Sequence, residues 1–219
     1  MFIYPGDPSI DWGSLEPFTD RKEVQILNDD EINDVGFLEE EFDQVRKYSK
    51  DIYIRTQLLS SETMGYRKGI SEVYADSFYP ISSSEISDNA ETAIVYESEK
   101  VVGKKIIKSG ENEEIDHALD KPVFDSHSIE LVFRLLPMAE DYSVKLPIFH
   151  SARNKEMTVK IDVVNSESLS TNRGVFDCWI IRSVWDDITQ MYWTSKGNKE
   201  IIKQQTIINE DTSLLFIAI

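Results

Sequence analysis

Residues 157–164 have the sequence MTVKIDVV, and residues 174–185, a little further along, have the sequence GVFDCWIIRSVW. In the first stretch, apolar side chains at 157, 159, 161 and 163 alternate with polar ones. This period of two is typical of a strand that buries one face and exposes the other. The second stretch is rich in β-branched and aromatic residues, which favour strands. Both stretches therefore predict a mainly β fold.

The stretch 174–185 carries apolar residues at its even and at its odd positions. A strand that is apolar on both faces is covered on both faces, so something besides the main core has to lie against the second one. A helix from Asp125 is the natural cover, and an apolar cavity is the alternative.

That helix is predicted to start near Asp125, whose carboxylate can accept the free amide protons of a first helical turn. Apolar residues follow at 129, 132, 133 and 136, which lie on one helical face, and Pro137 ends the pattern. A helix with one apolar face has to lie against a sheet.

Further strands are expected on both sides of the helix, while the charged segment GENEEID (110–116) is expected to form a loop. Their connections are short, which leaves room only for antiparallel pairing, because parallel strands need a long crossover. We expect a curved antiparallel sheet of about eight to ten strands, like a half-barrel or a β-roll, with one principal helix packed on it. The other expected strands are 51–60, 71–84, 92–96, 101–107, 142–150, 188–194, 199–208 and 213–219.

The 219 residues contain no internal repeat, which favours one domain. Five prolines and glycines lie in the first twenty residues, so 1–20 is expected to be an irregular arm and 21–219 a single antiparallel β-domain. Residues 24–45 are ambiguous: the apolar residues at 35, 38, 42 and 45 fit a helix, while GFLEEEF (36–42) fits an edge strand.

The chain carries a formal charge of −17, and residues 1–45 hold thirteen acidic residues but only two basic ones. A negative field repels phosphate backbones and anionic lipid headgroups, so nucleic acid is not expected as a partner. A solvated surface that aids solubility is the simplest interpretation of this acidic region. The alternative is an acidic patch that docks a basic protein partner.

No run of about 18 apolar residues occurs, so no transmembrane segment is expected. The N-terminus lacks the basic start and the apolar stretch of a signal peptide. We expect a cytoplasmic protein if the chain is complete, and a periplasmic or exported one if a leader was removed.

Histidine and cysteine residues are present, but their spacing does not match known metal-binding or catalytic motifs. His117, His127 and His150 lack the short spacings that place two metal ligands on one face. Cys178, the single cysteine, lies on an apolar strand face, where a cysteine behaves as a small hydrophobic residue. No catalytic residue, cofactor site or metal site is predicted, and nothing positive supports an enzyme.

A group of large side chains is the remaining candidate for a ligand cavity. Four aromatic residues fall within fifteen positions on two adjacent predicted strands, and aromatic residues dominate both cores and apolar pockets, so core packing is the alternative role. On the outer face of the helix Arg134 needs no partner, whereas an inward Arg134 needs a carboxylate or a ligand anion. The candidate residues are Trp179, Trp185, Tyr192, Trp193, Phe133 and Arg134.

Three segments carry a family resemblance: FDSHSIELVFRLLPMAEDYSVKLPIF at 124–149, GVFDCWIIR at 174–182 and MYWTSKGNKEIIK at 191–203. In order and spacing they resemble an uncharacterised bacterial family, the domain of unknown function numbered 3108, over about residues 120–208. The resemblance implies a curved antiparallel sheet around a helix, similar in outline to the Lol-type lipoprotein carriers. Many members of the family that the chain resembles are exported. The resemblance favours a strand for residues 24–45 and implies no reaction.

These observations favour a non-catalytic binding module that holds an apolar or acyl-containing ligand, such as a lipid, in the concavity of the sheet. The alternative is a structural or interaction protein whose acidic N-terminal region docks a basic partner. A hydrolase assembled from scattered carboxylates is a third class, and no motif supports it.

Overall fold

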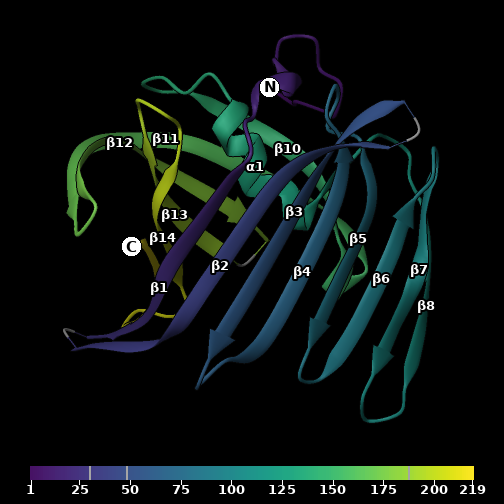
Figure 1. The fold of residues 1–219 in the computed structure, drawn as a ribbon, viewed down its shortest axis with the longest axis horizontal. Coiled ribbons are helices and arrows are strands. Elements are labelled where there is room, and N and C mark those ends of the chain that lie inside the picture. Colours follow the sequence, from purple (N-terminus) through teal and green to yellow (C-terminus); the bar gives the residue numbers. More distant parts are fainter. Residues whose placement is uncertain (30, 48, 187) are drawn as a thin grey trace.

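Fifteen strands of the described residues form one curved sheet around a single α-helix (Figure 1). The structure is a computed structural model and describes residues 1–29, 31–47, 49–186 and 188–219. The prediction of a mainly β fold with a curved sheet and one principal helix is confirmed.

The strands are β1 Phe18–Asn28, β2 Glu31–Lys47, β3 Lys50–Ser61, β4 Gly65–Tyr74, β5 Pro80–Ser87, β6 Ala90–Tyr96, β7 Lys100–Ile107, β8 Asn112–Ala118, β9 Phe124–Asp125, β10 Ser143–His150, β11 Lys155–Thr171, β12 Gly174–Trp185, β13 Ile188–Ser195, β14 Ile201–Ile207 and β15 Thr212–Ala218. The helical segments are η1 Trp12–Ser14, η2 Ser126–Ser128, α1 Ile129–Leu135 and η3 Ser151–Arg153.

The sheet consists of two meanders joined at their first and last strands. Neighbouring strands follow chain order from β1 to β8 on one side and run from β15 back to β9 on the other, and β1 pairs with β15. All pairs are antiparallel except β9 with β10. After β8 the chain forms the short β9, which pairs with β10 at the edge of the second meander. Helix α1 follows β9 and precedes β10. The helix therefore lies between the two meanders, inside the curve (Figure 1).

The far edge of the first meander comes back toward the second and is joined to it by side chains. The amide of Asn154 donates to Glu113 at 2.7 Å, His117 lies 3.0 Å from Glu156, and the ammonium of Lys105 donates to a backbone carbonyl in η3 at 3.0 Å. Beneath these contacts lies a small apolar cluster to which both meanders contribute. The sheet is thus barrel-like in outline, although no strand pairing of the described residues closes it.

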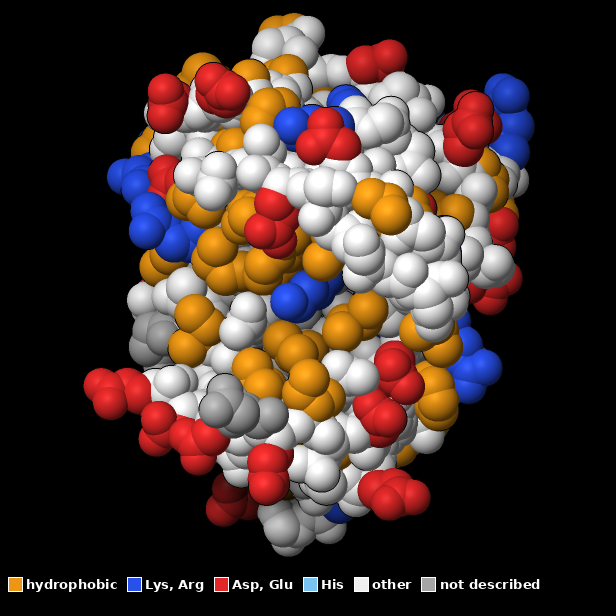
Figure 2. Space-filling view, turned by 90° about the vertical axis from the view of Figure 1, so that its left-hand side faces the viewer, with side chains coloured by type: hydrophobic (Ala, Val, Ile, Leu, Met, Phe, Trp, Pro, Cys, Tyr) orange, Lys and Arg blue, Asp and Glu red, His pale blue; other side chains and the backbone are white. Residues whose placement is uncertain are grey.

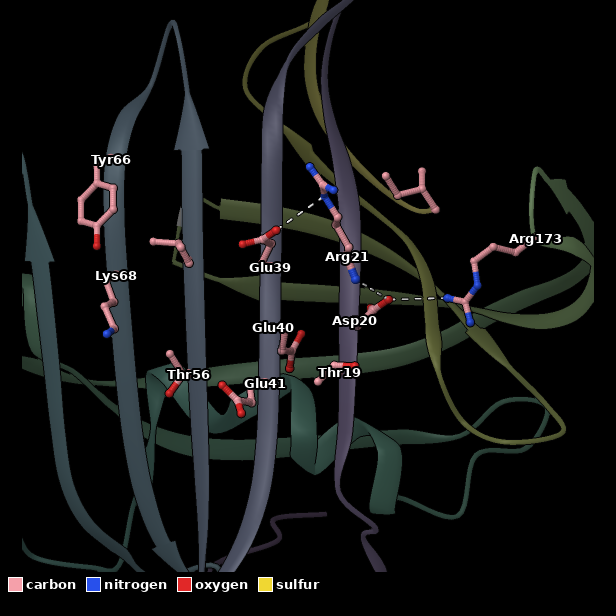
Figure 3. A pocket seen from close by; sticks show the side chains of 12 residues that line it. Thr19, Asp20, Arg21, Glu39, Glu40, Glu41, Thr56, Tyr66, Lys68 and Arg173 are labelled. Atoms are coloured by element: carbon pink, nitrogen blue, oxygen red, sulfur yellow. Dashed lines mark hydrogen bonds and ion pairs between the residues drawn. The ribbon is translucent and has the colours of Figure 1, made fainter.

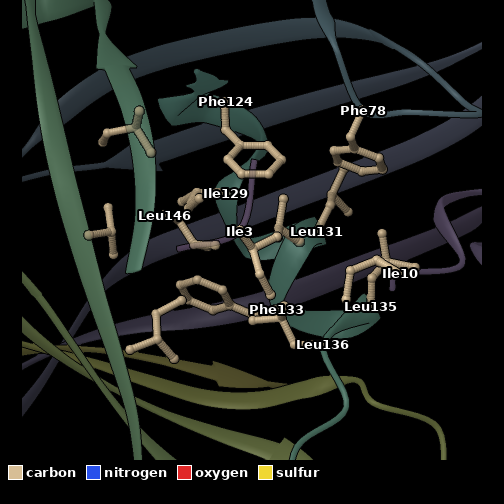
Figure 4. Close-up of a cluster of buried hydrophobic side chains, with 14 of the residues drawn as sticks. Ile3, Ile10, Phe78, Phe124, Ile129, Leu131, Phe133, Leu135, Leu136 and Leu146 are labelled. Atoms are coloured by element: carbon tan, nitrogen blue, oxygen red, sulfur yellow. The ribbon is translucent and has the colours of Figure 1, made fainter. Parts of the chain in front are cut away.

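The main core fills the space between α1 and the inner faces of both meanders (Figure 4). Five of the seven helix residues are buried, so the helix is apolar around most of its circumference. Such a helix needs apolar neighbours on several sides, which only a wrapped sheet offers. The Asp125 carboxylate caps the short segment η2, accepting from the backbone amide of His127 at 3.1 Å, and α1 follows directly from Ile129 without a side-chain cap of its own.

Residues 24–28 and 31–45 belong to strands, as the family resemblance implied; they form the last five residues of β1 and most of β2, and residue 30 between them lies outside the described residues. The sheet has more strands than the expected eight to ten. The stretch 71–84 is divided between β4 and β5 by a turn in which Phe78 takes φ 59°, and the segment 110–116, expected to be a charged loop, contains the first five residues of β8. An edge strand needs little apolar content, because only one of its sides is paired and much of its surface faces water.

The prediction that α1 covers the second face of β12 is wrong. The helix and the main core lie on the same side, where they contact Ile181 and Trp185. On the opposite face, Cys178 and Ile180 are buried by neighbouring side chains of the outer surface, among them Trp193 and Ile202. Large side chains on adjacent strands can bury one another without a further layer. Figure 2 shows hydrophobic side chains gathered around a basic one on the side of the molecule where the β11–β12 hairpin lies.

The irregular arm before β1 closes one end of the concavity. Ile3, Ile10 and Leu15 are buried in the main core, and the indole Nε1 of Trp12 donates to the backbone carbonyl of Asp7 at 2.9 Å. Among the described residues, the structure has no helix that is long and apolar enough to span a membrane.

Candidate functional site

Helix α1 carries one polar stripe, and this stripe faces the first meander. Glu130 and Arg134 stand one helical turn apart and are only partly buried, whereas the other helix residues are buried and apolar. Opposite them, the inward positions of β1, β2 and β3 carry Lys22, Glu40 and Arg55 in place of apolar side chains. A charged layer therefore lies between the helix and the sheet.

Arg55 is the centre of this charged layer and is only 3% exposed. Its Nε donates to Glu40 at 2.7 Å, and one terminal nitrogen donates to Glu130 and to the backbone carbonyl of His127, both at 2.6 Å. Burial disfavours the charge of Arg55, but Glu40 and Glu130 outweigh burial and raise its pKa. Burial likewise opposes the charge of Glu40, and Arg55 with Lys22 reverses the effect and lowers the pKa of Glu40.

The other cations of this layer are paired as well. Lys22 lies 3.6 Å from Glu40 and also donates to Asp20. Arg173, at the tip of the β11–β12 hairpin, lies 3.5 Å from Asp20 and pairs with Glu200. The hairpin tip thereby contributes to a site that is otherwise built by α1, the first three strands, and the turn before β14 with the first residue of that strand.

Arg134 is different, because it has no ion pair or hydrogen bond with any described residue. Its guanidinium lies 4.1 Å from the centre of the Phe18 ring, and its Nε is buried without a partner. Burial lowers the pKa of Arg134, while the more distant Glu40 and Glu200 partly oppose that shift. A buried donor that lacks an acceptor costs about 1–3 kcal/mol, so an acceptor placed beside Nε would be stabilising.

A cavity of about 230 Å³ lies in front of Arg134. Its wall combines the charged layer with the apolar side chains of Phe18, Leu131 and Ile201, and it is partly open to solvent. On the far side of Glu130 is a second cavity of about 140 Å³, lined by apolar Leu38 and Phe216 together with polar side chains. The Arg55–Glu130 ion pair stands between the two cavities.

The structure places the predicted cavity residues in different surroundings. Phe133 and Tyr192 pack edge to face in the main core, with ring centres 5.0 Å apart. Trp185 joins the same core, and Gln190 satisfies both polar groups: its Oε1 accepts from the indole of Trp185 at 3.0 Å and from the hydroxyl of Tyr192 at 2.8 Å. Trp179 packs at the margin of the core beneath Lys196, at 4.2 Å.

Trp193 is separated from the others. It belongs to the outer cluster and lies under Lys203, at 4.3 Å, while its indole donates to Glu167. Of the six predicted residues, Arg134 is the one that the structure places in the wall of either interior cavity described above.

Two residues of types that serve in catalysis in other proteins, His127 and Cys178, can be compared with the arrangements that such chemistry requires. The Nε2 of His127 lies 3.4 Å from the Ser151 hydroxyl and 3.6 Å from Glu85, but a serine triad needs the acid at the other ring nitrogen. Burial raises the pKa of the Cys178 thiol to about 11, so the reactive thiolate is scarce at neutral pH. Within the described ranges, no three His, Cys, Asp or Glu residues are grouped as metal ligands.

The outer face of the same strands has its own shallow groove, of about 720 Å³ (Figure 3). In that view α1 lies behind the strands, so the labelled side chains of Glu39, Glu41 and Lys68 stand on the convex surface. Arg21 pairs with Glu39 at 3.7 Å and lies over the ring of Phe37 at 4.2 Å. The groove shares Thr19, Asp20, Glu40 and Arg173 with the lining of the Arg134 cavity, so the two adjoin near the start of β1.

Sequence reasoning missed the charged layer around Arg55. The signal was present: Lys22, Glu40 and Arg55 share the inward parity of apolar neighbours such as Val24, Phe42 and Tyr53. What was lacking was the register between strands, which aligns these positions across β1, β2 and β3.

The comparisons with known proteins concern the fold and the family. Among solved structures, the chain is similar to the crystal structure of a beta-barrel-like protein of the domain of unknown function DUF1849 from Brucella abortus, with a TM-score of 0.53 and 12% sequence identity. The similarity covers 94% of this chain and 96% of that one, and at this identity it concerns the fold alone. No curated protein matches the chain. The family model described as "Protein of unknown function (DUF3108)" matches residues 36–213, and the chain belongs to this family.

Proposed function

We propose that the protein is a non-catalytic binding module that holds an acyl-containing ligand in the cavity beside Arg134. The observation that carries the proposal is the buried Nε of Arg134, a donor without an acceptor in a cavity wall where Lys22, Arg55 and Arg173 are all paired. An ester or amide carbonyl of the ligand supplies the missing acceptor.

The charges of the wall favour a neutral acceptor over an anion. Four basic residues line the cavity, and four carboxylates, those of Asp20, Glu40, Glu130 and Glu200, balance them. A carboxylate or phosphate bound there would add an uncompensated negative charge close to these acids, at a cost that grows as the surroundings become less polar. A carbonyl satisfies Nε and leaves the balance unchanged.

The size of the cavity limits what enters it. Ligand pockets usually measure about 300–1,000 Å³, so 230 Å³ accommodates one end of a ligand, not a whole lipid. Phe18, Leu131 and Ile201 provide apolar contact for the carbon atoms next to the carbonyl. The rest of the ligand extends through the open side of the cavity.

Three eight-carbon probes test the proposal: octanamide, octanoate and octylamine, each titrated against an environment-sensitive dye bound to the protein. Octanamide is expected to displace the dye best. Native mass spectrometry of gently purified protein tests for a retained ligand.

The Arg134→Met variant keeps an unbranched side chain that reaches about as far as Nε and removes the guanidinium donors. Octanamide binding is expected to weaken about ten- to a hundredfold, the range for a lost hydrogen bond to a charged group. Arg21→Met is the matched control, because Arg21 also lies over an aromatic ring but on the outer face. Equal affinity for the three probes, or an unchanged affinity in Arg134→Met, would refute the proposal.

The alternative role, docking of a basic partner by the acidic N-terminal region, has one supporting observation. Glu39, Glu41 and Asp43 are exposed along the outer face of β2. Capture of a lysine-rich peptide that fails steeply as salt rises would support this role, because exposed charge contacts are screened. Salt-insensitive capture would contradict it.

A further inference from the structure

A separate cleft of about 770 Å³ lies at the edge of the molecule near the N-terminal arm. It opens between the turn that joins β4 to β5 and the segment that leads from β8 to β9. Its aromatic and apolar lining consists of Tyr74, Tyr79, Tyr96, Pro80, Pro122 and Leu119. The Arg134 cavity and this cleft share no lining residue.

The arm holds Tyr79 in place as one wall of the cleft. Gly6 lies against the Tyr79 ring so closely that an added Cβ would sit 2.9 Å from a ring carbon, and its φ of +78° also favours glycine. The backbone amide of Gly6 donates to the carbonyl of Ser77 at 2.6 Å, which fixes the arm on the turn. Tyr79 nevertheless remains 40% exposed, so a large part of the ring is free for a ligand.

The turn beneath Tyr79 is anchored on both sides. Phe78 is fully buried in the main core, and its amide donates to the carbonyl of Tyr74 at 2.8 Å. Tyr74 is itself covered by the ammonium of Lys50, at 4.2 Å from the ring centre. The aromatic surface is therefore preformed, which lowers the entropic cost of binding.

The polar groups of the cleft are mainly acidic. Asp76 and Glu97 are exposed in its lining, against the single basic residue Lys50. The whole chain carries −17, so the surrounding field adds to the attraction for a basic group.

We infer that this cleft docks a proline-rich, extended segment of a partner protein that carries a basic residue beside its prolines. Polyproline II segments bind in grooves lined by aromatic side chains, because their rings pack on tyrosines and their backbone is already extended. The exposed side chains of Tyr79 and Pro122 offer such a surface, and Asp76 or Glu97 pairs with the basic residue.

Fluorescein-labelled peptides test this inference by fluorescence polarisation with the full chain. The probe RPLPPLPP is expected to bind saturably, and RALAALAA, which has the same charge and length, is expected to bind at least about tenfold more weakly. Tyr79→Ala is expected to weaken binding of RPLPPLPP about tenfold, as loss of an aromatic anchor does. Tyr66→Ala is the matched control, because Tyr66 is 43% exposed on the outer face of β4 and outside the cleft.

Glu97→Gln provides a second variant that does not depend on the turn, since Glu97 is exposed. It is expected to weaken RPLPPLPP and to leave a peptide that lacks the arginine unaffected. Absence of saturable binding at millimolar peptide, equal binding of both peptides, or displacement of the probe by a cello-oligosaccharide would overturn the inference. Unchanged binding in Arg134→Met would support a site independent of the interior cavity, and loss of binding there would contradict it.

Discussion

The two sides of helix α1 meet the sheet in different ways. Toward the second meander, Phe133 packs edge to face on Tyr192, and Val132 and Leu136 are fully buried. Toward the first meander, Glu130 joins the Arg55 ion pairs, and Arg134 faces a cavity without a partner. The apolar side is fully packed, whereas on the charged side one buried donor, the Nε of Arg134, has no acceptor. This difference is the reason for proposing that a ligand binds on the charged side.

The largest effect is expected from Arg55→Met. Without the guanidinium, the carboxylates of Glu40 and Glu130 lose their shared cation in a buried layer, which lowers the free energy of unfolding by about 3–5 kcal/mol. Urea denaturation followed by tryptophan fluorescence measures this loss. As a control, Arg182→Met removes an exposed ion pair with Asp162 and costs less than about 1 kcal/mol. Similar losses in both variants would show that burial adds nothing to the Arg55 pairs.

A pH effect of intermediate size is expected from His150, at the end of β10. Burial, with smaller effects of His127 and Arg153, lowers the pKa of His150 from 6.5 to about 4. The unfolded chain therefore binds a proton that the folded chain does not, and stability falls as the pH drops from 6.5 toward 4.

At pH 5 this His150 effect amounts to about 2 kcal/mol. The test compares the loss of unfolding free energy between pH 7 and pH 5 in the wild type with the loss in His150→Asn. The variant is expected to lose about 2 kcal/mol less over this interval. Parallel pH profiles would contradict the assignment.

Phe133→Leu tests how much the ring contact on the apolar side of the helix contributes to stability. The substitution keeps an apolar side chain in the core and removes the ring contact with Tyr192, which is worth about 0.5–1.5 kcal/mol. Thermal unfolding followed by circular dichroism measures the change. Phe37→Leu, at an exposed ring on the outer face, is the control and is expected to have a smaller effect. A loss of stability in Phe133→Leu as large as that in Arg55→Met would contradict the expected order of the two effects.

The smallest effect is expected from Arg134→Met, within about 0.5 kcal/mol of the wild type. The lost contact with Phe18 is worth about 0.5–1 kcal/mol, and removal of a buried donor without an acceptor offsets it. Urea denaturation tests this directly. A loss like that of Arg55→Met would show that Arg134 is a structural residue, and it would contradict the separation of the two arginines.

Much of the fold could be predicted because its signals are local. The alternation in β11, the cap at Asp125 and the turns of the second meander depend on neighbours in the chain. Strand β8 could not be recognised, because five of its seven residues are polar or charged and the strand is defined by its pairing with β7. The charged layer depends on the register of three strands, which sequence spacing does not show.

The predicted aromatic group illustrates a signal that was available. Successive residues of a strand point to opposite faces, so Tyr192 and Trp193 could not share a cavity. The structure places Tyr192 in the main core and Trp193 in the outer cluster accordingly. Arg134 was recognised as the residue whose orientation mattered, but only the packing of α1 shows that it faces a cavity.

The contact between the edge strands β7 and β8 and the region after β10 bears on how much the interior can accommodate. It consists of side-chain contacts from Glu113, His117 and Lys105 above a small apolar cluster, and no ladder of backbone bonds crosses it. Separating these two edges breaks no pairing between neighbouring strands. The two edges can therefore move apart to admit a molecule larger than the present interior space. The free energy required is that of a few surface side-chain contacts and one small apolar cluster.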